Sequence, residues 1–68
     1  MNKDIIQGNW HEIKGKLKQQ WGKLTDDEIN QMEGNYDELT GILQKQYGYR
    51  KDEVKKEIES FINGFSWK

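Results

Sequence analysis

The chain repeats itself within 68 residues. The stretch GNWHEIKGKLKQQWG at residues 8–22 aligns without a gap with GNYDELTGILQKQYG at residues 34–48, an offset of 26 residues, and seven of the 15 aligned positions are identical. Three further positions keep their aromatic or aliphatic character: Trp10/Tyr36, Ile13/Leu39 and Trp21/Tyr47. The positions that are kept are mostly apolar or glycine. The repeat is therefore better explained by two similar helical hairpins that bury each other than by a duplicated binding unit.

Length and composition limit the fold to one small domain over residues 1–68. A chain this short buries a small core, and the absence of Cys removes disulfides and thiolate metal sites while fitting a reducing compartment. Charged residues make up 34% of the chain, and the mean hydropathy of −1.17 leaves disorder as an alternative. Three Trp, three Tyr and two Phe argue instead for a helical fold with an aromatic core.

Apolar residues at steps of three or four predict the helices. One stripe predicts a helix over about residues 9–21, and a start as early as residue 3 is left open: Ile6, Trp10, Ile13, Leu17 and Trp21. A second stripe predicts helices between residues 26 and 47: Ile29, Met32, Tyr36, Leu39 and Leu43. A last helix is expected over about residues 51–63, with Ile62 facing inward. The expected core is Trp10, Ile13, Leu17, Trp21, Ile29, Met32, Tyr36, Leu39, Leu43, Val54, Ile58 and Phe61.

Capping residues and glycines predict the helix ends. Thr25 and Glu28 form the pattern of a capping box. The pair Gly34–Asn35 combines a helix stop with an N-cap residue and therefore favours two helices over one helix spanning 26–47. Gly22 suits the left-handed position after a helix, Gly48 breaks the helix before it, and Gly64 ends the last one.

Gly15 and Gly41 occupy equivalent positions in the middle of the two predicted helices. A glycine inside a helix costs about 1 kcal/mol relative to Ala. Close approach of another backbone or an aromatic ring at both places would explain the cost, so we expect a close internal neighbour at each.

Three motifs resemble the CsbD-like family of small bacterial stress-response proteins: GNW, KGKLKQQWGKLTDDE and YGYRKDEV. The resemblance covers about residues 5–62 and implies one CsbD-like domain over residues 1–68, with the internal repeat at 8–29 and 34–54. It implies an all-α fold of four short helices, arranged as two roughly orthogonal hairpins in a SAM-domain-like manner. It also implies a general role under starvation, salt or heat stress, without catalytic residues.

The chain departs from that family pattern in two places. Gly34–Asn35–Tyr36 has no basic residue where many members carry Lys or Arg, which weakens any polyanion site in the middle segment. The C-terminal FINGFSWK is more apolar than the charged tails of the family. Phe65 and Trp67 can therefore either pack on the domain or stay exposed, and the sequence leaves both alternatives open.

The sequence offers little for catalysis, cofactors, metals or small-molecule substrates. His11 is the only histidine, and zinc sites use about three protein ligands. The run Asp26–Glu28 is explained by capping, and the glycines are spread along helices rather than gathered in a phosphate-binding loop. We therefore expect a protein that is not an enzyme and has no cofactor.

Charge is distributed unevenly and leaves two interpretations. Residues 1–24 carry a net charge of +3, residues 25–48 carry −5 and residues 49–68 carry +1. Attraction between the first helix and the middle segment is favoured. The alternative is weak binding of nucleic acid by a lysine cluster on or beside the first helix: Lys14, Lys16, Lys18 and Lys23. The overall net charge of −1 and the absence of Arg from residues 1–49 argue against strong or base-specific binding.

A protein-interaction or protective module is the function that the sequence favours. Tyr49, Phe65 and Trp67 are candidate partner-docking aromatics, because aromatic side chains anchor many interfaces. No run approaches the roughly 18 apolar residues of a membrane span, and the first residues lack the apolar segment of a signal peptide. We therefore expect a cytoplasmic protein.

Overall fold

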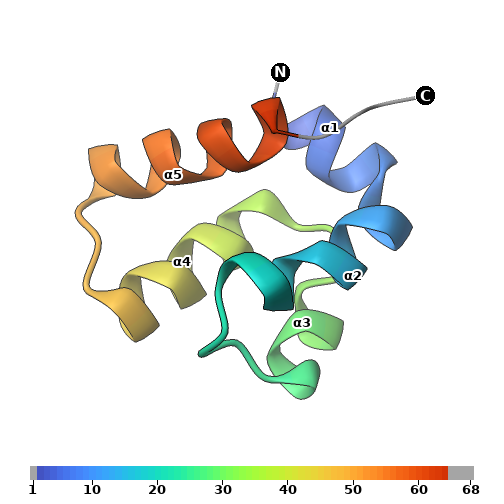
Figure 1. Ribbon diagram of the computed structural model, residues 1–68, viewed down its shortest axis with the longest axis horizontal. Coiled ribbons are helices and arrows are strands. Elements are labelled where there is room, and N and C mark those ends of the chain that lie inside the picture. The colour runs from blue at the N-terminus through green and yellow to red at the C-terminus, as the bar shows by residue number, and fades with distance from the viewer. Residues whose placement is uncertain (1, 65–68) are drawn as a thin grey trace.

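The computed structural model describes residues 2–64, which form five α-helices and no strand (Figure 1). The helices are α1 (Asn2–Gly8), α2 (Trp10–Gln20), α3 (Asp26–Met32), α4 (Tyr36–Tyr47) and α5 (Lys51–Asn63). The all-α class is thus confirmed, with one helix more than the four expected.

The helix predicted over about residues 9–21 is present as α2, and the additional helix is α1, which Asn9 separates from it. The backbone N–H of Asn9 and its side-chain Nδ2 both donate to the carbonyl oxygen of Ile5, at 3.0 and 3.1 Å. Asn9 lies outside helical geometry (φ −118°, ψ 24°), and its own carbonyl accepts from Glu12 and Ile13 at the start of α2. A side chain that bonds locally to the backbone ends α1 and lets the chain turn into α2.

The end of α2 differs from the expectation for Gly22. Trp21 caps the helix with an extended backbone (φ −127°, ψ 88°), and its N–H still donates to Leu17 at 2.8 Å. Within residues 2–64, the glycines with positive φ are Gly34 and Gly48. The left-handed position predicted for Gly22 is therefore wrong, because Trp21 already carries the chain out of the helix.

The break between α3 and α4 lies where the sequence predicted it. Glu33 and Gly34 both take left-handed backbone angles, with φ of 49° and 81°. The Oδ1 atom of Asn35 then accepts from the N–H of Glu38 at 3.1 Å and caps α4. Two helices over residues 26–47 are confirmed. Gly48 ends α4 in the left-handed conformation, as expected for a helix-breaking glycine.

The core runs through all five helices and the α2–α3 connection. The buried hydrophobic residues are Ile6, Ile13, Leu17, Trp21, Leu24, Ile29, Met32, Leu39, Leu43, Val54, Ile58, Phe61 and Ile62. Ten of the twelve expected core residues are among them; Trp10 and Tyr36 are half-buried and contact the core from its edge. Ile6 and Leu24 were not on the expected list, and Ile62 faces inward as predicted.

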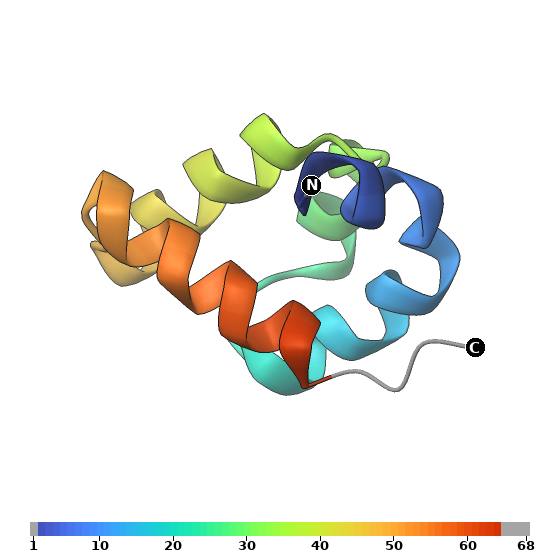
Figure 2. The same ribbon diagram turned by 90° about the horizontal axis from the view of Figure 1, so that it is seen from above.

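Helix α4 lies at the centre of the arrangement and contacts α1, α3 and α5, while α2 contacts α1 and α3. Figure 2 shows α1 beside the start of α4. The radius of gyration is 10.8 Å, close to the roughly 11 Å of a compact chain of this length. The description as one domain of two orthogonal hairpins stays a prediction.

Candidate binding surfaces on the helices α2, α3 and α4

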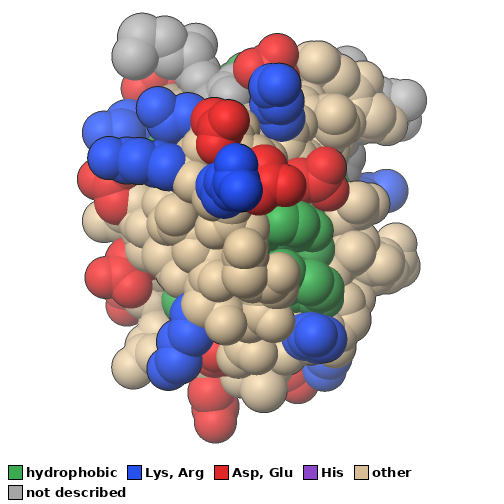
Figure 3. Space-filling view, turned by 90° about the vertical axis from the view of Figure 1, so that its left-hand side faces the viewer, with side chains coloured by type: hydrophobic (Ala, Val, Ile, Leu, Met, Phe, Trp, Pro, Cys, Tyr) green, Lys and Arg blue, Asp and Glu red, His purple; other side chains and the backbone are tan. Residues whose placement is uncertain are grey.

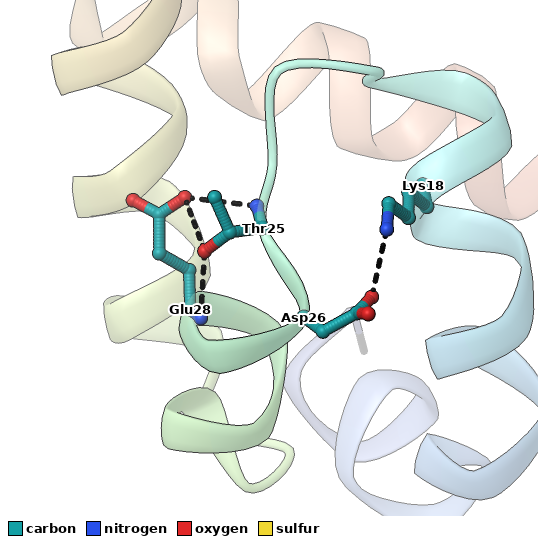
Figure 4. A network of polar contacts seen from close by, with 4 residues as sticks. All are labelled: Lys18, Thr25, Asp26 and Glu28. Carbon is teal, nitrogen blue, oxygen red and sulfur yellow. Dashed lines mark hydrogen bonds and ion pairs between the residues drawn. The ribbon is translucent and has the colours of Figure 1, made fainter.

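The start of α3 is fixed by a reciprocal set of hydrogen bonds. The N–H of Glu28 donates to Thr25 Oγ1 at 3.1 Å, and the N–H of Thr25 donates to Glu28 Oε1 at 3.0 Å (Figure 4). This is the capping box that the sequence predicted. It holds Asp26, the first residue of α3, at the end of the helix that faces α2.

The side chain of Glu28 also joins α3 to α4. Its Oε2 atom accepts from Gln46 Nε2 at 2.9 Å. The hydrogen bond from the Thr25 backbone and then that from Gln46 stabilise the carboxylate, so the pKa of Glu28 lies below its usual value. The polar contacts of Glu28 therefore fix α3 relative to the centre of the fold.

The four lysines of the predicted polyanion site do not form one open patch. Lys18 Nζ is 2.9 Å from Asp26 Oδ1, across the space between α2 and α3 (Figure 4). Lys23 Nζ lies 5.1 Å from the ring centre of Tyr47, a cation–π contact. Lys14 is half-buried and Lys16 is exposed. At least two of the four cations thus have partners within the molecule, as expected if the first helix and the middle segment attract each other.

A second exposed ion pair also joins the basic residues 1–24 to the acidic residues 25–48. Lys3 Nζ is 3.8 Å from Asp37 Oδ2, so α1 is linked to the first turn of α4. Exposed pairs of this kind contribute at most about 1 kcal/mol each. The two ion pairs bring opposite charges of the two segments together, but they contribute little to the stability of the fold.

A groove lies between α2 and α3, and we call it the Gly15 groove. It encloses about 520 Å³ and is lined by His11, Lys14, Gly15 and Lys18 from α2 and by Asp26, Ile29 and Asn30 from α3. Gly15 and Ile29 are its non-polar lining, and the remaining residues are polar or charged. Sequence reasoning found the lysines but did not bring Ile29 and Asn30 to them, because that needs the turn between the helices.

A hollow on the outer side of α4 forms a second surface, which we call the Gly41 face. It encloses about 390 Å³ and is lined by Asn35, Asp37, Glu38, Gly41, Ile42 and Lys45. Ile42 is half-buried. The lining carries two acids and one base, the opposite balance to that of the Gly15 groove.

The expected close neighbours of Gly15 and Gly41 are absent from the described part of the chain. Both glycines are exposed, and a Cβ atom added at either would meet nothing within 4 Å. The expectation was wrong because each glycine faces outward, while Ile13, Leu17, Leu39 and Leu43 fill the core. The fold itself does not explain the two mid-helix glycines.

The close approach occurs at Gly34 instead. A Cβ atom there would lie 3.4 Å from Gln7 Cα and 3.4 Å from Trp10 Cβ and Cγ. Gly34 is buried, and its φ of 81° also favours glycine. This residue therefore lets α1 and Trp10 approach the α3–α4 connection.

Tyr49, the first of the predicted docking aromatics, is half-buried beside other aromatic rings. Its hydroxyl accepts from Trp21 Nε1 at 3.3 Å, and its ring stacks on Tyr47 with the ring centres 5.5 Å apart. The Tyr47 hydroxyl accepts from the N–H of Lys23 at 3.0 Å. The two tyrosines thus join the α2–α3 and α4–α5 connections.

Figure 3 views the end of the molecule that carries the α4–α5 connection and shows a small hydrophobic patch among charged side chains. The other two predicted docking aromatics, Phe65 and Trp67, lie outside the described residues, so docking through any of the three stays a prediction.

Residues 2–64 show no arrangement typical of a catalytic or metal site. They contain no buried polar or charged residue and no group of three or more His, Cys, Asp or Glu side chains placed to hold a metal ion. His11 is exposed at the rim of the Gly15 groove. No helix in this part of the chain combines the length and the apolar character needed to cross a membrane.

Comparison with known proteins defines the family. The model of the CsbD family, described as CsbD-like, matches residues 4–56. The chain therefore belongs to the CsbD-like family, as its motifs suggested.

Curated relatives match nearly the whole chain. The UPF0337 protein YjbJ of Escherichia coli K12 is 55% identical over 69 residues, covering 98% of this chain and 100% of the relative. The UPF0337 protein RB0906 of Rhizobium meliloti is 54% identical over 67 residues, covering 98% and 97%. The YjbJ protein of Salmonella typhimurium LT2 is 49% identical over 69 residues, covering 98% and 99%. No solved structure matched the chain significantly.

Proposed function

We propose that this protein is a non-enzymatic stress-response protein of the bacterial cytoplasm that acts as a protein-interaction or protective module. Membership in the CsbD-like family supports the stress setting. The observation that carries the molecular part is the separation of hydrophobic from charged side chains among the described residues. Their buried side chains are hydrophobic and their charged side chains lie at the surface. Such a molecule presents a polar surface for contacts while keeping its hydrophobic groups inside.

Nucleic-acid binding is the weaker alternative. Some of the lysines that would contact phosphates already have partners within the molecule: Lys18 pairs with Asp26, and Lys23 lies over the ring of Tyr47. The remaining positive charge would neutralise few phosphates, and such contacts weaken steeply with salt. Protein contacts are therefore favoured over contacts with a polyanion.

The test is light scattering of a thermolabile enzyme, heated with and without an equimolar amount of this protein. We expect scattering to fall when the protein is present. In parallel, binding to a short DNA duplex is measured at about 150 mM salt, where lysine–phosphate contacts are strongly screened. We expect weak binding or none.

The double variant Lys14→Glu/Lys18→Glu separates the two functions, and Lys55→Glu/Lys56→Glu on the exposed side of α5 is its charge-matched control. Scattering that does not change, together with micromolar DNA binding lost in the first variant and kept in the second, would replace the proposed function by nucleic-acid binding.

A further inference from the structure

We propose that the Gly15 groove of one molecule binds the Gly41 face of a second copy of this chain. This inference rests on the proposed function, because it names a protein partner for the interaction module. The two surfaces meet through helices α2 and α4, and the missing side chains of the two glycines let these helices approach closely.

The first argument is that both glycines lack a role inside the molecule. Each lies in the middle of a helix where Ala would be a better helix former, and each has open space where a side chain would project. The same position carries glycine in both copies of the repeat. A helix surface without a side chain at one point allows another helix to come near it, as small residues do between transmembrane helices.

The second argument is that both hollows also expose apolar surface that a contact between copies would cover. Ile42 follows Gly41 and is a half-buried aliphatic side chain at the edge of its surface. The Gly15 groove offers a non-polar lining of Gly15 and Ile29, with enough volume for such a side chain. Bringing the two surfaces together therefore buries the exposed part of Ile42 against the non-polar lining of the groove.

The third argument is complementary charge. The Gly15 groove carries Lys14 and Lys18 against Asp26, whereas the Gly41 face carries Asp37 and Glu38 against Lys45. The pairs Lys18–Asp26 and Lys3–Asp37 are exposed, so they are weakly held and open to exchange with a partner. The net charge of −1 leaves little repulsion between copies.

The contact joins two unlike surfaces and is therefore heterologous. Each molecule keeps one free surface of each kind after the first contact, so association continues into short chains unless a ring closes. Because oppositely charged groups face each other, association weakens as salt is raised.

The test uses sedimentation equilibrium of the full chain at concentrations from about 10 μM to about 1 mM, a range suited to weak contacts. The variants Gly15→Leu and Gly41→Leu fill one surface each. The matched control is Gln20→Leu, an exposed position on α2 that does not share the face of Gly15. Circular dichroism verifies that each variant is folded, which we expect because a side chain at either glycine would start into open space.

We expect the average mass of the parent protein to rise with concentration, and Kd to rise by about tenfold or more in each glycine variant. Gln20→Leu should associate like the parent. An equimolar mixture of the two glycine variants should form a one-to-one pair, because one partner keeps an intact Gly41 face and the other an intact Gly15 groove.

Three results would overturn the proposal: a parent protein that stays monomeric, a mixture that stays monomeric although each variant is folded, or equal weakening by Gln20→Leu. Loss of DNA binding in Gly15→Leu without any self-association would assign the groove to a polyanion instead. None of these sedimentation results alters the light-scattering test, so failure of this contact and failure of the proposed function are distinguishable.

Discussion

The two copies of the repeat, residues 8–22 and 34–48, share their buried side chains and differ at both ends. Ile13 and Leu39 occupy equivalent positions and are 0% exposed, as are Leu17 and Leu43. The aromatic residues that precede them, Trp10 and Tyr36, are both half-buried at the edge of the core. The middle of α2 and the middle of α4 therefore contribute equivalent side chains to the core.

The N-terminal ends use the same dipeptide differently. Gly8 is the last residue of α1 and has open space around it, whereas Gly34 is buried and left-handed. Asn35 accepts a hydrogen bond from the helix that follows it, while Asn9 donates one to the helix that precedes it. Identical residues thus build different connections, one between α1 and α2 and the other between α3 and α4.

The C-terminal ends differ as well. Trp21 is buried, with its ring centre 5.0 Å from that of Phe61, whereas the equivalent Tyr47 is half-buried and bonded to the backbone of Lys23. Gly48 ends α4 with a φ of 69°, and Gly22 does not have positive φ. Equivalent residues of the two copies are thus buried alike in the core, whereas identical residues at the helix ends differ in backbone conformation and hydrogen bonds.

The largest expected effect tests the shared core. Leu17→Ala and Leu43→Ala should each lower the free energy of unfolding by about 2–5 kcal/mol, out of about 3–10 kcal/mol for a chain of this length. Urea unfolding followed by circular dichroism measures both, with the exposed Gln19→Ala as control. A variant that loses less than the control would show that its copy does not supply a core position.

The next effect separates the two glycines at the N-terminal ends. Gly34→Ala should lower the free energy of unfolding by about 1–2 kcal/mol, because Ala is strained at positive φ, while its Cβ would only contact Gln7 and Trp10. Gly8→Ala should be neutral or slightly stabilising. Thermal unfolding of the pair checks this difference, and equal responses would mean that the two connections are alike.

A smaller effect separates the two asparagines. Asn35→Asp should keep or raise stability, since Asp is an equally good N-cap and its charge suits a helix N-terminus. Asn9→Asp should lose about 1 kcal/mol, because the Nδ2 donor to Ile5 is replaced by an acceptor. Melting temperatures at neutral pH compare the two, and a stabilising Asn9→Asp would place Asn9 in a capping role like that of Asn35.

The sequence predicted those parts of the fold that depend on local chemistry. The Thr25–Glu28 capping box, the Gly34–Asn35 break and most of the buried stripe are set by side-chain spacing and nearby hydrogen bonds. The break at Asn9 was missed, because periodicity continues from Ile6 through α2 while the backbone turns. Burial of Leu24 was missed too, since it lies in a connection where no helical period applies.

The candidate surfaces were less accessible from sequence. The lysines of α2 were visible as a cluster, but the pairing of Lys18 with Asp26 depends on the turn that brings α3 beside α2. The mid-helix glycines were the one signal for both surfaces. Their direction, outward rather than toward a neighbour, follows only from the three-dimensional arrangement of Ile13 and Leu39.

The most direct test of this account is the stability of the double variant Gly15→Ala/Gly41→Ala, measured by urea unfolding in dilute solution. Neither glycine is needed inside the molecule, so each substitution should stabilise the helix that carries it, by up to about 1 kcal/mol. A double variant more stable than the parent is the predicted result. A double variant less stable than the parent would contradict the account, because it would mean that the fold itself requires glycine at the centre of each copy.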